Sequence, residues 1–229
     1  MVALTLAAAA FVLIHLLVSG TRLRDALTGR IGEGAYMGLF SLASLGIIVW
    51  MSLSYGGARS DAANLTFWPA TPATKVVQLV LTLIAFLLIV PGLLTPNPTS
   101  VKQEGALDKP DAVKGMLRIT RHPFLWGVAI WAFGHLLVNG DLASFVLFGA
   151  MLGLAVLGTT SIDAKRRRVL GEKWDAFAAQ TSNAPFAAIL AGRQKLHIGE
   201  IGWRLAVAIV VWGAVLAGHR MAFGVSPLP

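Results

Sequence analysis

The sequence predicts an all-α fold, namely a polytopic membrane helix bundle with about six transmembrane helices and additional amphipathic helices on the cytoplasmic side. Three observations predict this class. Of the 229 residues, 56% are hydrophobic and only 13% are charged, which differs from the composition of soluble domains. The apolar residues form stretches of membrane-spanning length, and the basic residues alternate between the links that connect these stretches.

Six apolar stretches define the expected helices. They run over residues 2–19, 34–54, 76–95, 123–139, 142–162 and 202–219. A helix of about 20 residues crosses the roughly 30 Å of hydrocarbon in a bilayer, so each stretch is read as one span. The first stretch has no basic segment before it and is longer than the apolar part of a signal peptide, so we expect it to be a retained helix.

The basic residues orient these helices. The links after the first, third and fifth stretches hold 3, 5 and 8 of the 19 Lys and Arg residues, which leaves 3 on the opposite side. The positive-inside rule therefore predicts a multi-pass protein of the cell inner (cytoplasmic) membrane with both termini periplasmic. The net charge of +8 then reflects topology, and the expected partner is the lipid bilayer and not nucleic acid.

Two of the basic links have helical apolar spacing. The segments "KPDAVKGMLRI" (109–119) and "KRRRVLGEKWDAFAAQT" (165–181) predict amphipathic helices at the inner leaflet. No internal repeat and no flexible linker divides the chain, so residues 1–229 are expected to form one integral membrane domain. The absence of cysteine excludes disulfides, thiolate metal sites and a cysteine nucleophile.

His15 and His135 are ionisable residues within apolar stretches, where such a side chain normally has a partner in the bundle interior. One interpretation of each is a neutral imidazole bonded to a neighbouring helix. Two such imidazoles in one bundle also match the axial ligation of a haem iron between facing helices. Zinc usually needs four ligands, and the spans offer no convincing third and fourth.

His122 lies in "RHP" (121–123), which marks the start of a helix. The residue before a proline is disfavoured in helical geometry, and Pro123 suits the first turn. His122 is therefore either an interfacial residue that holds the link at the lipid headgroups or part of a ligand site. The segment "DAKRRR" (163–168) likewise either binds an anionic ligand or anchors the helix end on the cytoplasmic side.

A set of short elements spread over nearly the whole chain carries a resemblance to a known family. They are "GMLRITRHP" (115–123), Trp131 and His135 of "IWAFGH", Asp163, "LG" (170–171), "PFAAI" (185–189), "GRQ" (192–194), and His15 followed by "RD" (24–25) and "GE" (32–33). These elements resemble the NnrU proteins of bacteria and their plant relatives, the 15-cis-zeta-carotene isomerases.

The resemblance implies haem b as cofactor, with His15 and His135 matching the two axial ligands by position. We expect Arg118, Arg121 and His122 near the cytoplasmic mouth, at the haem propionates. The resemblance also implies a redox-dependent cis–trans isomerisation of a hydrophobic polyene such as zeta-carotene. The plant pattern has a cysteine three residues before the second histidine, where this chain has alanine, so a mechanism through that thiolate is excluded. The natural substrate, the electron donor and whether the chain is catalytic are left undetermined.

Two alternatives stay open. The bacterial branch is associated with nitrite and nitric oxide respiration, which predicts a non-catalytic haem redox protein of denitrification. The "RHP" element also resembles isoprenylcysteine methyltransferase-like enzymes, which bind S-adenosylmethionine, although Leu125 replaces their tyrosine and a lone Asp163 stands for their carboxylate pair.

At 1.5 Å per residue, His15 lies about 7 Å and His135 about 18 Å from the cytoplasmic ends of their spans. His122 is therefore kept as an alternative second ligand.

Overall fold

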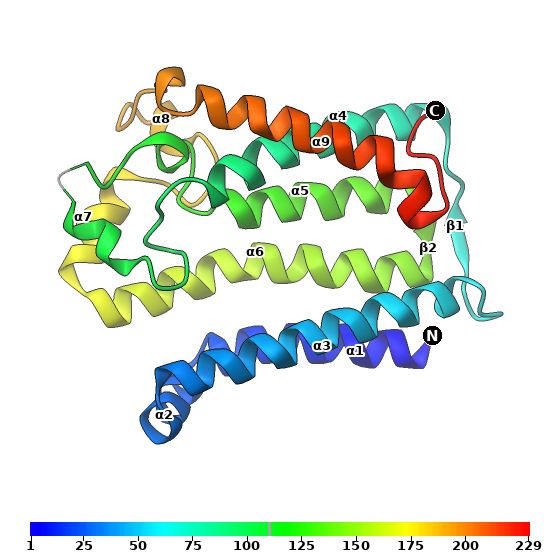
Figure 1. Cartoon of the computed structure of the whole chain (residues 1–229), viewed down its shortest axis with the longest axis horizontal. Helices are drawn as coiled ribbons and strands as arrows, with labels where there is room; N and C mark the ends of the chain where they lie inside the picture. The colour runs from blue at the N-terminus through cyan, green and yellow to red at the C-terminus, as the bar shows by residue number, and fades with distance from the viewer. Residues whose placement is uncertain (110) are drawn as a thin grey trace.

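Long apolar helices run side by side in the computed structural model, which describes residues 1–109 and 111–229 (Figure 1). They are α1 (Val2–Leu13) with its π-helical continuation η1 (Ile14–Ser19), α3 (Glu33–Arg59), α4 (Pro72–Leu93), α5 (Pro123–Val138), α6 (Leu142–Leu170) and α9 (Gly202–Phe223). Five of these spans in the described residues are long and apolar enough to cross a membrane, and α5, with 16 residues, is shorter. The predicted all-α membrane bundle is confirmed, and its fourth helix is shorter than a full span.

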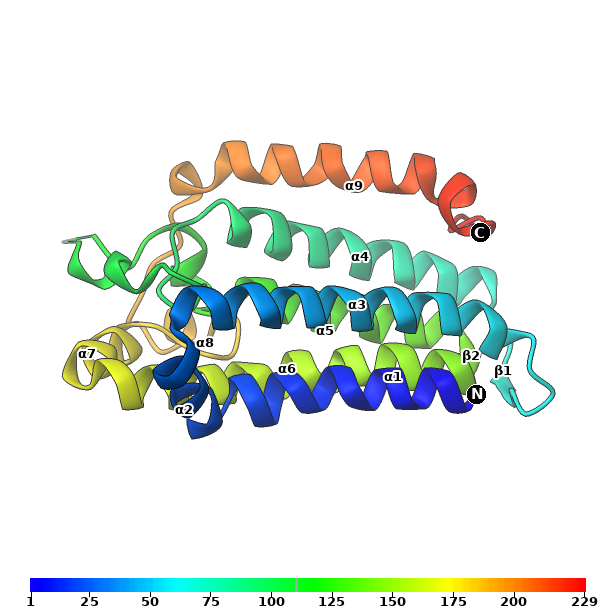
Figure 2. The same ribbon diagram turned by 60° about the horizontal axis from the view of Figure 1, so that its bottom comes forward.

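Short elements cover the two ends of the bundle. One end carries α2 (Arg22–Ile31), η2 (Glu104–Asp108), η3 (Gly115–Arg118), α7 (Glu172–Gln180), α8 (Ala187–Leu190) and η4 (Ile198–Glu200). At the other end, β1 (Thr66–Trp68) pairs antiparallel with β2 (Gly140–Asp141). Both termini lie at this second end (Figures 1 and 2), opposite the links that the sequence assigns to the cytoplasm.

The predicted helical segment over 165–181 is present, in two parts. Helix α6 extends to Leu170, and α7 follows after a single glycine. The apolar side of α7 is not turned to lipid, because Trp174 and Phe177 are buried against Leu117. The segment therefore covers the end of the bundle and holds the link before α5 in place.

The predicted amphipathic helix over 109–119 is wrong for the residues that the structure describes. Only the single turn η3 forms there, and Pro110 lies outside the described residues. The cause is local: Lys114 has extended backbone angles and Gly115 has a φ of +58°. Neither conformation continues an α-helix, so the apolar side chains of this segment pack from a turn.

Helix starts follow local capping rules. The Thr71 hydroxyl accepts a hydrogen bond from the backbone at the start of α4, and Asp141 does the same for α6. His122 directly precedes α5 with a φ of −122° and a ψ of 52°. This non-helical geometry is what the sequence predicts for a residue before proline, and it places the polar residues of "RHP" at the end of the bundle.

Small residues let the central helices approach closely. Gly127 and Gly134 lie seven residues apart on the face of α5 that packs against α4. An added Cβ would lie 2.5 Å from Ile89 at the first position and 2.2 Å from Gln78 at the second. Glycine is therefore required at Gly127, where the Ala85 carbonyl oxygen is also only 2.8 Å away, whereas at Gly134 the first atom met is the end of the Gln78 side chain. Small residues of this kind are common where membrane helices pack. The close approach also brings Gln78 of α4 against the last turns of α5.

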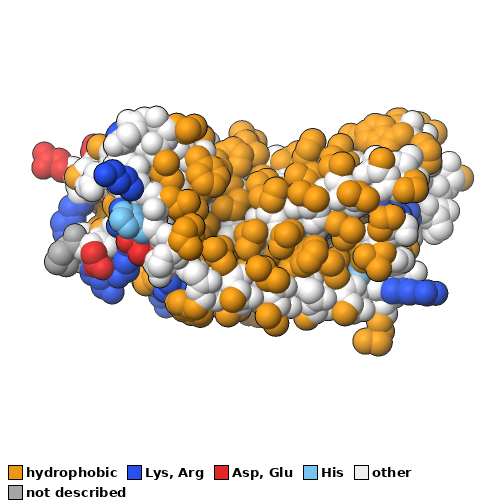
Figure 3. All heavy atoms as spheres, turned by 90° about the horizontal axis from the view of Figure 1, so that it is seen from above, with side chains coloured by type: hydrophobic (Ala, Val, Ile, Leu, Met, Phe, Trp, Pro, Cys, Tyr) orange, Lys and Arg blue, Asp and Glu red, His pale blue; other side chains and the backbone are white. Residues whose placement is uncertain are grey.

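Apolar side chains cover the outside of the bundle. Figure 3 shows hydrophobic side chains along the length of the helices, with charged side chains gathered at the ends. Leu53 on α3 and Val210 on α9 are 76% and 71% exposed. An apolar exterior of this extent requires lipid around it. The chain is therefore a membrane protein, as its hydropathy predicts.

Candidate functional site

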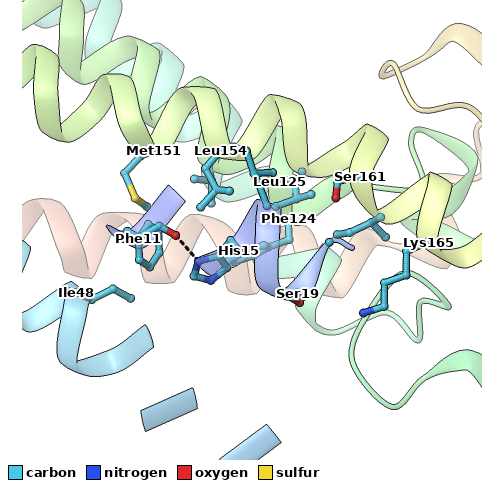
Figure 4. A pocket seen from close by; sticks show the side chains of 16 residues that line it. Phe11, His15, Ser19, Ile48, Phe124, Leu125, Met151, Leu154, Ser161 and Lys165 are labelled. Atoms are coloured by element: carbon cyan, nitrogen blue, oxygen red, sulfur yellow. Dashed lines mark hydrogen bonds between the residues drawn. The ribbon is translucent and has the colours of Figure 1, made fainter. Parts of the chain in front are cut away.

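A cavity of about 310 Å³ lies between α1, α3, α5 and α6 (Figure 4). Its lining consists of Phe11, His15, Leu16, Ser19, Gly20, Ile48, Phe124, Leu125, Val128, Met151, Leu154, Ala155, Gly158, Ser161, Ile162 and Lys165. The volume is at the lower end of the range for small-molecule pockets, about 300–1,000 Å³. Most of these side chains are apolar, so the cavity suits a narrow apolar ligand.

His15 projects from the π-helical turn η1 toward this cavity (Figure 4). Its Nδ1 lies 2.7 Å from the carbonyl oxygen of Phe11, so Nδ1–H donates to that oxygen and Nε2 keeps its lone pair. Nε2 has one distant neighbour, the Ser44 hydroxyl at 3.5 Å. Single π-helical turns are frequent at functional sites. A histidine with Nδ1–H bound to a carbonyl and Nε2 free has the arrangement that metal-ligating histidines use.

His135 has the same ring chemistry in a different place. Its Nδ1 lies 2.8 Å from the Trp131 carbonyl oxygen and 2.9 Å from the side-chain amide of Gln78. Gln78 Oε1 is buried without a partner among the described residues. The direction of the contact between Gln78 and Nδ1 depends on the tautomer of His135, and in either orientation one end of the Gln78 amide is left without a partner among the described residues. The ring also stacks on Phe148, with 4.8 Å between centroids.

The two histidines lie at different depths in the bundle. Gly20, five residues after His15, lies against Ser161 of α6. His135 stacks on Phe148, thirteen residues before Ser161 on the same helix, so the two histidines are offset by about eight residues. At 1.5 Å per residue this is a difference of about 10–15 Å. Axial ligands hold one iron from opposite sides at close range. The pair His15 and His135 therefore does not fit a single haem in this packing, although each ring alone has suitable donor chemistry.

His122 lies in a buried ionic cluster at the start of α5. Its side chain is 1% exposed, and its Nε2 lies 2.7 Å from Oδ1 of Asp163. Arg121 donates from Nε to both oxygens of the same carboxylate, at 2.9 and 3.0 Å, and from Nη2 to one of them. Burial lowers the pKa of His122 below its ordinary 6.5, and the hydrogen bond with Asp163 only partly opposes this effect. The neutral ring thus donates Nε2–H to Asp163.

Arg118 is held by a second carboxylate. Its Nε and Nη2 donate to the two oxygens of Glu200 at 2.9 and 2.8 Å, and its Nη1 donates to Gln194 at 2.8 Å. The hydrogen bonds from Arg118 lower the pKa of Glu200 to about 2, against a smaller opposing effect of burial. Contacts of Arg118 and Arg121 with haem propionates stay a prediction, and both guanidinium groups already pair with carboxylates of the chain.

Two of the sequence blocks that carry the family resemblance fold against each other. The backbone N–H of Phe186 donates to the Ile119 carbonyl at 2.8 Å, and Nη1 of Arg118 donates to Gln194 at 2.8 Å. Asp163 contacts Arg121 of the first block and accepts a bond at 3.3 Å from Asn183, which lies just before the second. The blocks 115–123 and 185–194 thus form one unit that closes the end of the bundle.

Sequence reasoning missed three residues that complete these sites. Gln78 is a polar residue within an apolar span, and that was the available signal for its pairing with His135. Glu200 directly precedes the last span but is 82 residues from Arg118, so no periodicity links them. Lys165 belongs to the segment expected to be an anion site or an anchor, and the structure places it in the cavity lining. In the described parts of the chain, no three His, Asp or Glu side chains form a group that could hold a metal ion.

Comparison with known proteins agrees with the resemblance. A family model described as NnrU protein matches residues 3–227. The chloroplastic 15-cis-zeta-carotene isomerase of Zea mays is 30% identical over 171 residues, covering 72% of this chain and 45% of that protein. The corresponding protein of Arabidopsis thaliana is 31% identical over 193 residues, covering 81% and 50%.

The chain spans about half the length of the curated relatives that it matches. No solved structure matches it significantly. The family model, in contrast, covers nearly every residue, including both histidines of the spans and the ionic cluster at the end of the bundle. The chain belongs to the NnrU family.

Proposed function

We propose that the chain is a membrane-embedded cis–trans isomerase of a long polyene of the carotenoid class. The observation that carries the proposal is the apolar cavity beside His15, within the transmembrane helices. The similarity to two zeta-carotene isomerases over 72% and 81% of the chain supports it. A hydrocarbon offers no polar group for recognition, so it is selected by shape and apolar contact, which this lining provides.

The cavity residues bind and orient the polyene and keep water away from it. Leu125, Val128 and Leu154 supply apolar walls, and His15 is the polar group midway along the cavity (Figure 4). A neutral imidazole in this position can orient the polyene or bind a metal ion. It is too weak an acid to protonate a carbon–carbon double bond of a hydrocarbon. Isomerisation therefore needs a further group that lowers the order of the double bond.

We propose haem b as that group, which His15 would hold through its Nε2. The support is the ring itself, because Nδ1–H is fixed on the Phe11 carbonyl and Nε2 is free at the cavity. When bound, haem supplies a redox-active iron beside the substrate. Ligation by His15 and His135 together requires α5 to shift along its axis. Ligation by His122 would use Nδ1, which is buried without a partner among the described residues, while Nε2 stays with Asp163.

We also propose that the protein lies in the inner (cytoplasmic) membrane with both termini periplasmic. The links that carry most of the basic residues fold at one end of the bundle, and both termini lie at the other (Figure 1). This arrangement supports the orientation that the positive-inside rule predicts. The cavity then has its Lys165 end toward the cytoplasm and its Met151 end toward the bilayer centre.

An isomer assay with a cavity-filling variant tests the proposal. Detergent-purified, haem-supplied and reduced protein is incubated with a 15-cis polyene, and the isomers are separated by chromatography. A Cβ at Gly158 meets Leu125 at an ordinary 3.5 Å, so Gly158→Leu can fold while its longer side chain fills the cavity. Gly153→Leu on the same helix is the control, since a Cβ there meets nothing within 4 Å. We expect at least a tenfold loss of turnover in the first variant only.

The absorption spectrum of the same samples separates the alternatives. No Soret band after haem supply would exclude the cofactor. An intact haem spectrum without turnover of any polyene would contradict the isomerase and support a non-catalytic haem redox protein linked to denitrification. Binding of S-adenosylmethionine would favour the methyltransferase-like alternative, for which Asp163 would first have to leave Arg121.

A further inference from the structure

Lys165 is a cation in the wall of an apolar cavity. It lines the cavity with Ser19 and Ser161, at the end opposite Met151 (Figure 4). Its side chain is only partly exposed. An ammonium group that is partly removed from water is unfavourable unless an anion compensates it. The question is therefore which anion lies at this end of the cavity.

The carboxylates of the chain around Lys165 are already paired with arginines. The pairs are Asp25 with Arg168, Glu33 with Arg24, and Glu104 with Arg166. Among the described residues, no carboxylate lies within 4.0 Å of Lys165. The cations Arg24 and Arg166 act on it from nearby, and the more weakly acting Asp25 and Glu33 oppose them only in part. Lys165 thus has no carboxylate partner among the described residues. Arg118 and Arg121, in contrast, each pair with a carboxylate of the chain.

The shape of the cavity indicates what kind of molecule carries the missing anion. From Met151 to Lys165 the cavity follows α6 for fourteen residues, which is about 20 Å at 1.5 Å per residue. Apart from His15 midway along the cavity, its polar groups are at one end: the hydroxyls of Ser19 and Ser161 and the Lys165 ammonium. Gly20 keeps this end tight, since an added Cβ would lie 2.5 Å from the Ser161 hydroxyl oxygen. The remaining length is apolar up to and beyond His15.

We propose that the cavity binds an amphiphile whose carboxylate or phosphate group pairs with Lys165 and whose apolar part extends along α6 to His15. The hydroxyls of Ser19 and Ser161 donate to the same anionic group. The inference rests on the proposed function in that it uses the same cavity, but it concerns binding and not turnover. The anionic group has two sources: the headgroup of a long-chain acid or acidic lipid, or a propionate of haem.

Native mass spectrometry of the full chain, released from a neutral detergent, tests the proposal. The probes are oleic acid, dioleoyl phosphatidic acid and hemin, each titrated beside a neutral counterpart: methyl oleate, dioleoylglycerol and hemin dimethyl ester. Lys165→Gln removes the charge and Lys165→Arg restores it. Arg167→Gln is the matched control, because Arg167 follows Lys165 closely on α6, is 62% exposed and, among the described residues, pairs only with the exposed Asp175.

We expect one acidic probe per chain, with the apparent Kd raised at least tenfold in Lys165→Gln and unchanged in Lys165→Arg and Arg167→Gln. If Lys165→Gln loses affinity only for oleic acid and phosphatidic acid, the site binds a lipid. If it loses affinity only for hemin, and not for hemin dimethyl ester, the site binds a propionate. Equal binding of acids and neutral counterparts, or equal binding to the wild-type chain and Lys165→Gln, overturns the proposal. Because the readout is binding, it is independent of any isomerase activity.

Discussion

Nε2 of His122 lies 2.7 Å from Oδ1 of Asp163, although 41 residues separate them in the chain. The same carboxylate accepts the guanidinium of Arg121, and the side chains of Arg121 and Asp163 are only 12% and 15% exposed. Together the three residues tie the start of α5 to α6. Because the cavity is bounded by these two helices on one side, its shape depends on this ionic cluster.

Asp163→Asn is expected to destabilise the bundle strongly. The substitution leaves the Arg121 guanidinium buried without a carboxylate, and removing one partner of a buried ion pair costs about 3 kcal/mol or more. Unfolding of the detergent-solubilised protein by heat or denaturant measures the loss. Asp175→Asn is the control, since its pair with Arg167 is exposed on both sides and exposed ion pairs contribute little to stability. Equal losses in the two variants would contradict the role of the cluster.

The stability of the protein is expected to fall as the pH falls below 6.5. Burial lowers the pKa of folded His122 below that value, so the unfolded chain binds the proton more readily in this window and protonation favours unfolding. Midpoints of thermal unfolding recorded above and below pH 6.5 measure the slope, and His122→Gln should flatten it. An unchanged slope in the variant would assign the effect to other groups.

Glu200 contributes to the stability of the folded chain in a lower pH range than His122. Its pKa is about 2 in the folded chain, against an ordinary value of 4.5 for a glutamate, so the stability that its pair with Arg118 provides is present above pH 4.5 and lost as the pH falls toward 2. Glu200→Gln should remove this acid-dependent part of the unfolding curve while leaving the window around pH 6.5 intact. A variant that shifts both windows would indicate that the two clusters unfold together.

Gly127→Ala and Gly134→Ala are expected to destabilise the contact of α5 with α4. A methyl group would lie 2.5 Å from Ile89 in the first variant and 2.2 Å from Gln78 in the second, and overpacking of this kind costs about 1–3 kcal/mol. Gly149→Ala on α6 is the control, because its Cβ meets nothing within 4 Å. If all three alanine variants unfold at the same denaturant concentration, the close approach of the helices is not required.

Haem binding is expected to depend on His15 more than on His135. His15 faces the cavity, whereas His135 stacks on Phe148 deeper along α5. His15→Ala should therefore lose the Soret band of the haem-supplied protein, and His135→Ala should retain it. His219→Ala, near the far end of α9, is the control. Loss of the band in both His15→Ala and His135→Ala would show that α5 shifts to bring the pair onto one iron.

The orientation in the membrane is directly testable because the chain has no cysteine. Ser60→Cys and Glu172→Cys place single thiols at exposed positions near opposite ends of the bundle. In intact cells, a membrane-impermeant maleimide should label the first variant, and it should label the second only after the membrane is opened. The reverse pattern would contradict the positive-inside assignment.

Much of the fold was predictable from residue patterns. The apolar spans appear as helices close to the expected residues, and α5 starts at Pro123 as the "RHP" element predicts. The helix expected over 109–119 failed because the positive φ of Gly115 is a property of one position, and apolar spacing does not report it. The pairing of Gln78 with His135 was not predictable, since it depends on how α4 packs against α5.

By itself, the sequence determined the fold class, the family and the polar residues that occur within the membrane spans. These properties depend on local composition and on short motifs, and both involve residues that are close together in the sequence. The tertiary structure alone decided that His15 and His135 lie at different depths, that Arg118 and Arg121 have internal carboxylates, and that Lys165 has none among the described residues. The reason is that depth, burial and pairing depend on the axial offset of helices distant in sequence, and that offset is set by side-chain packing between them.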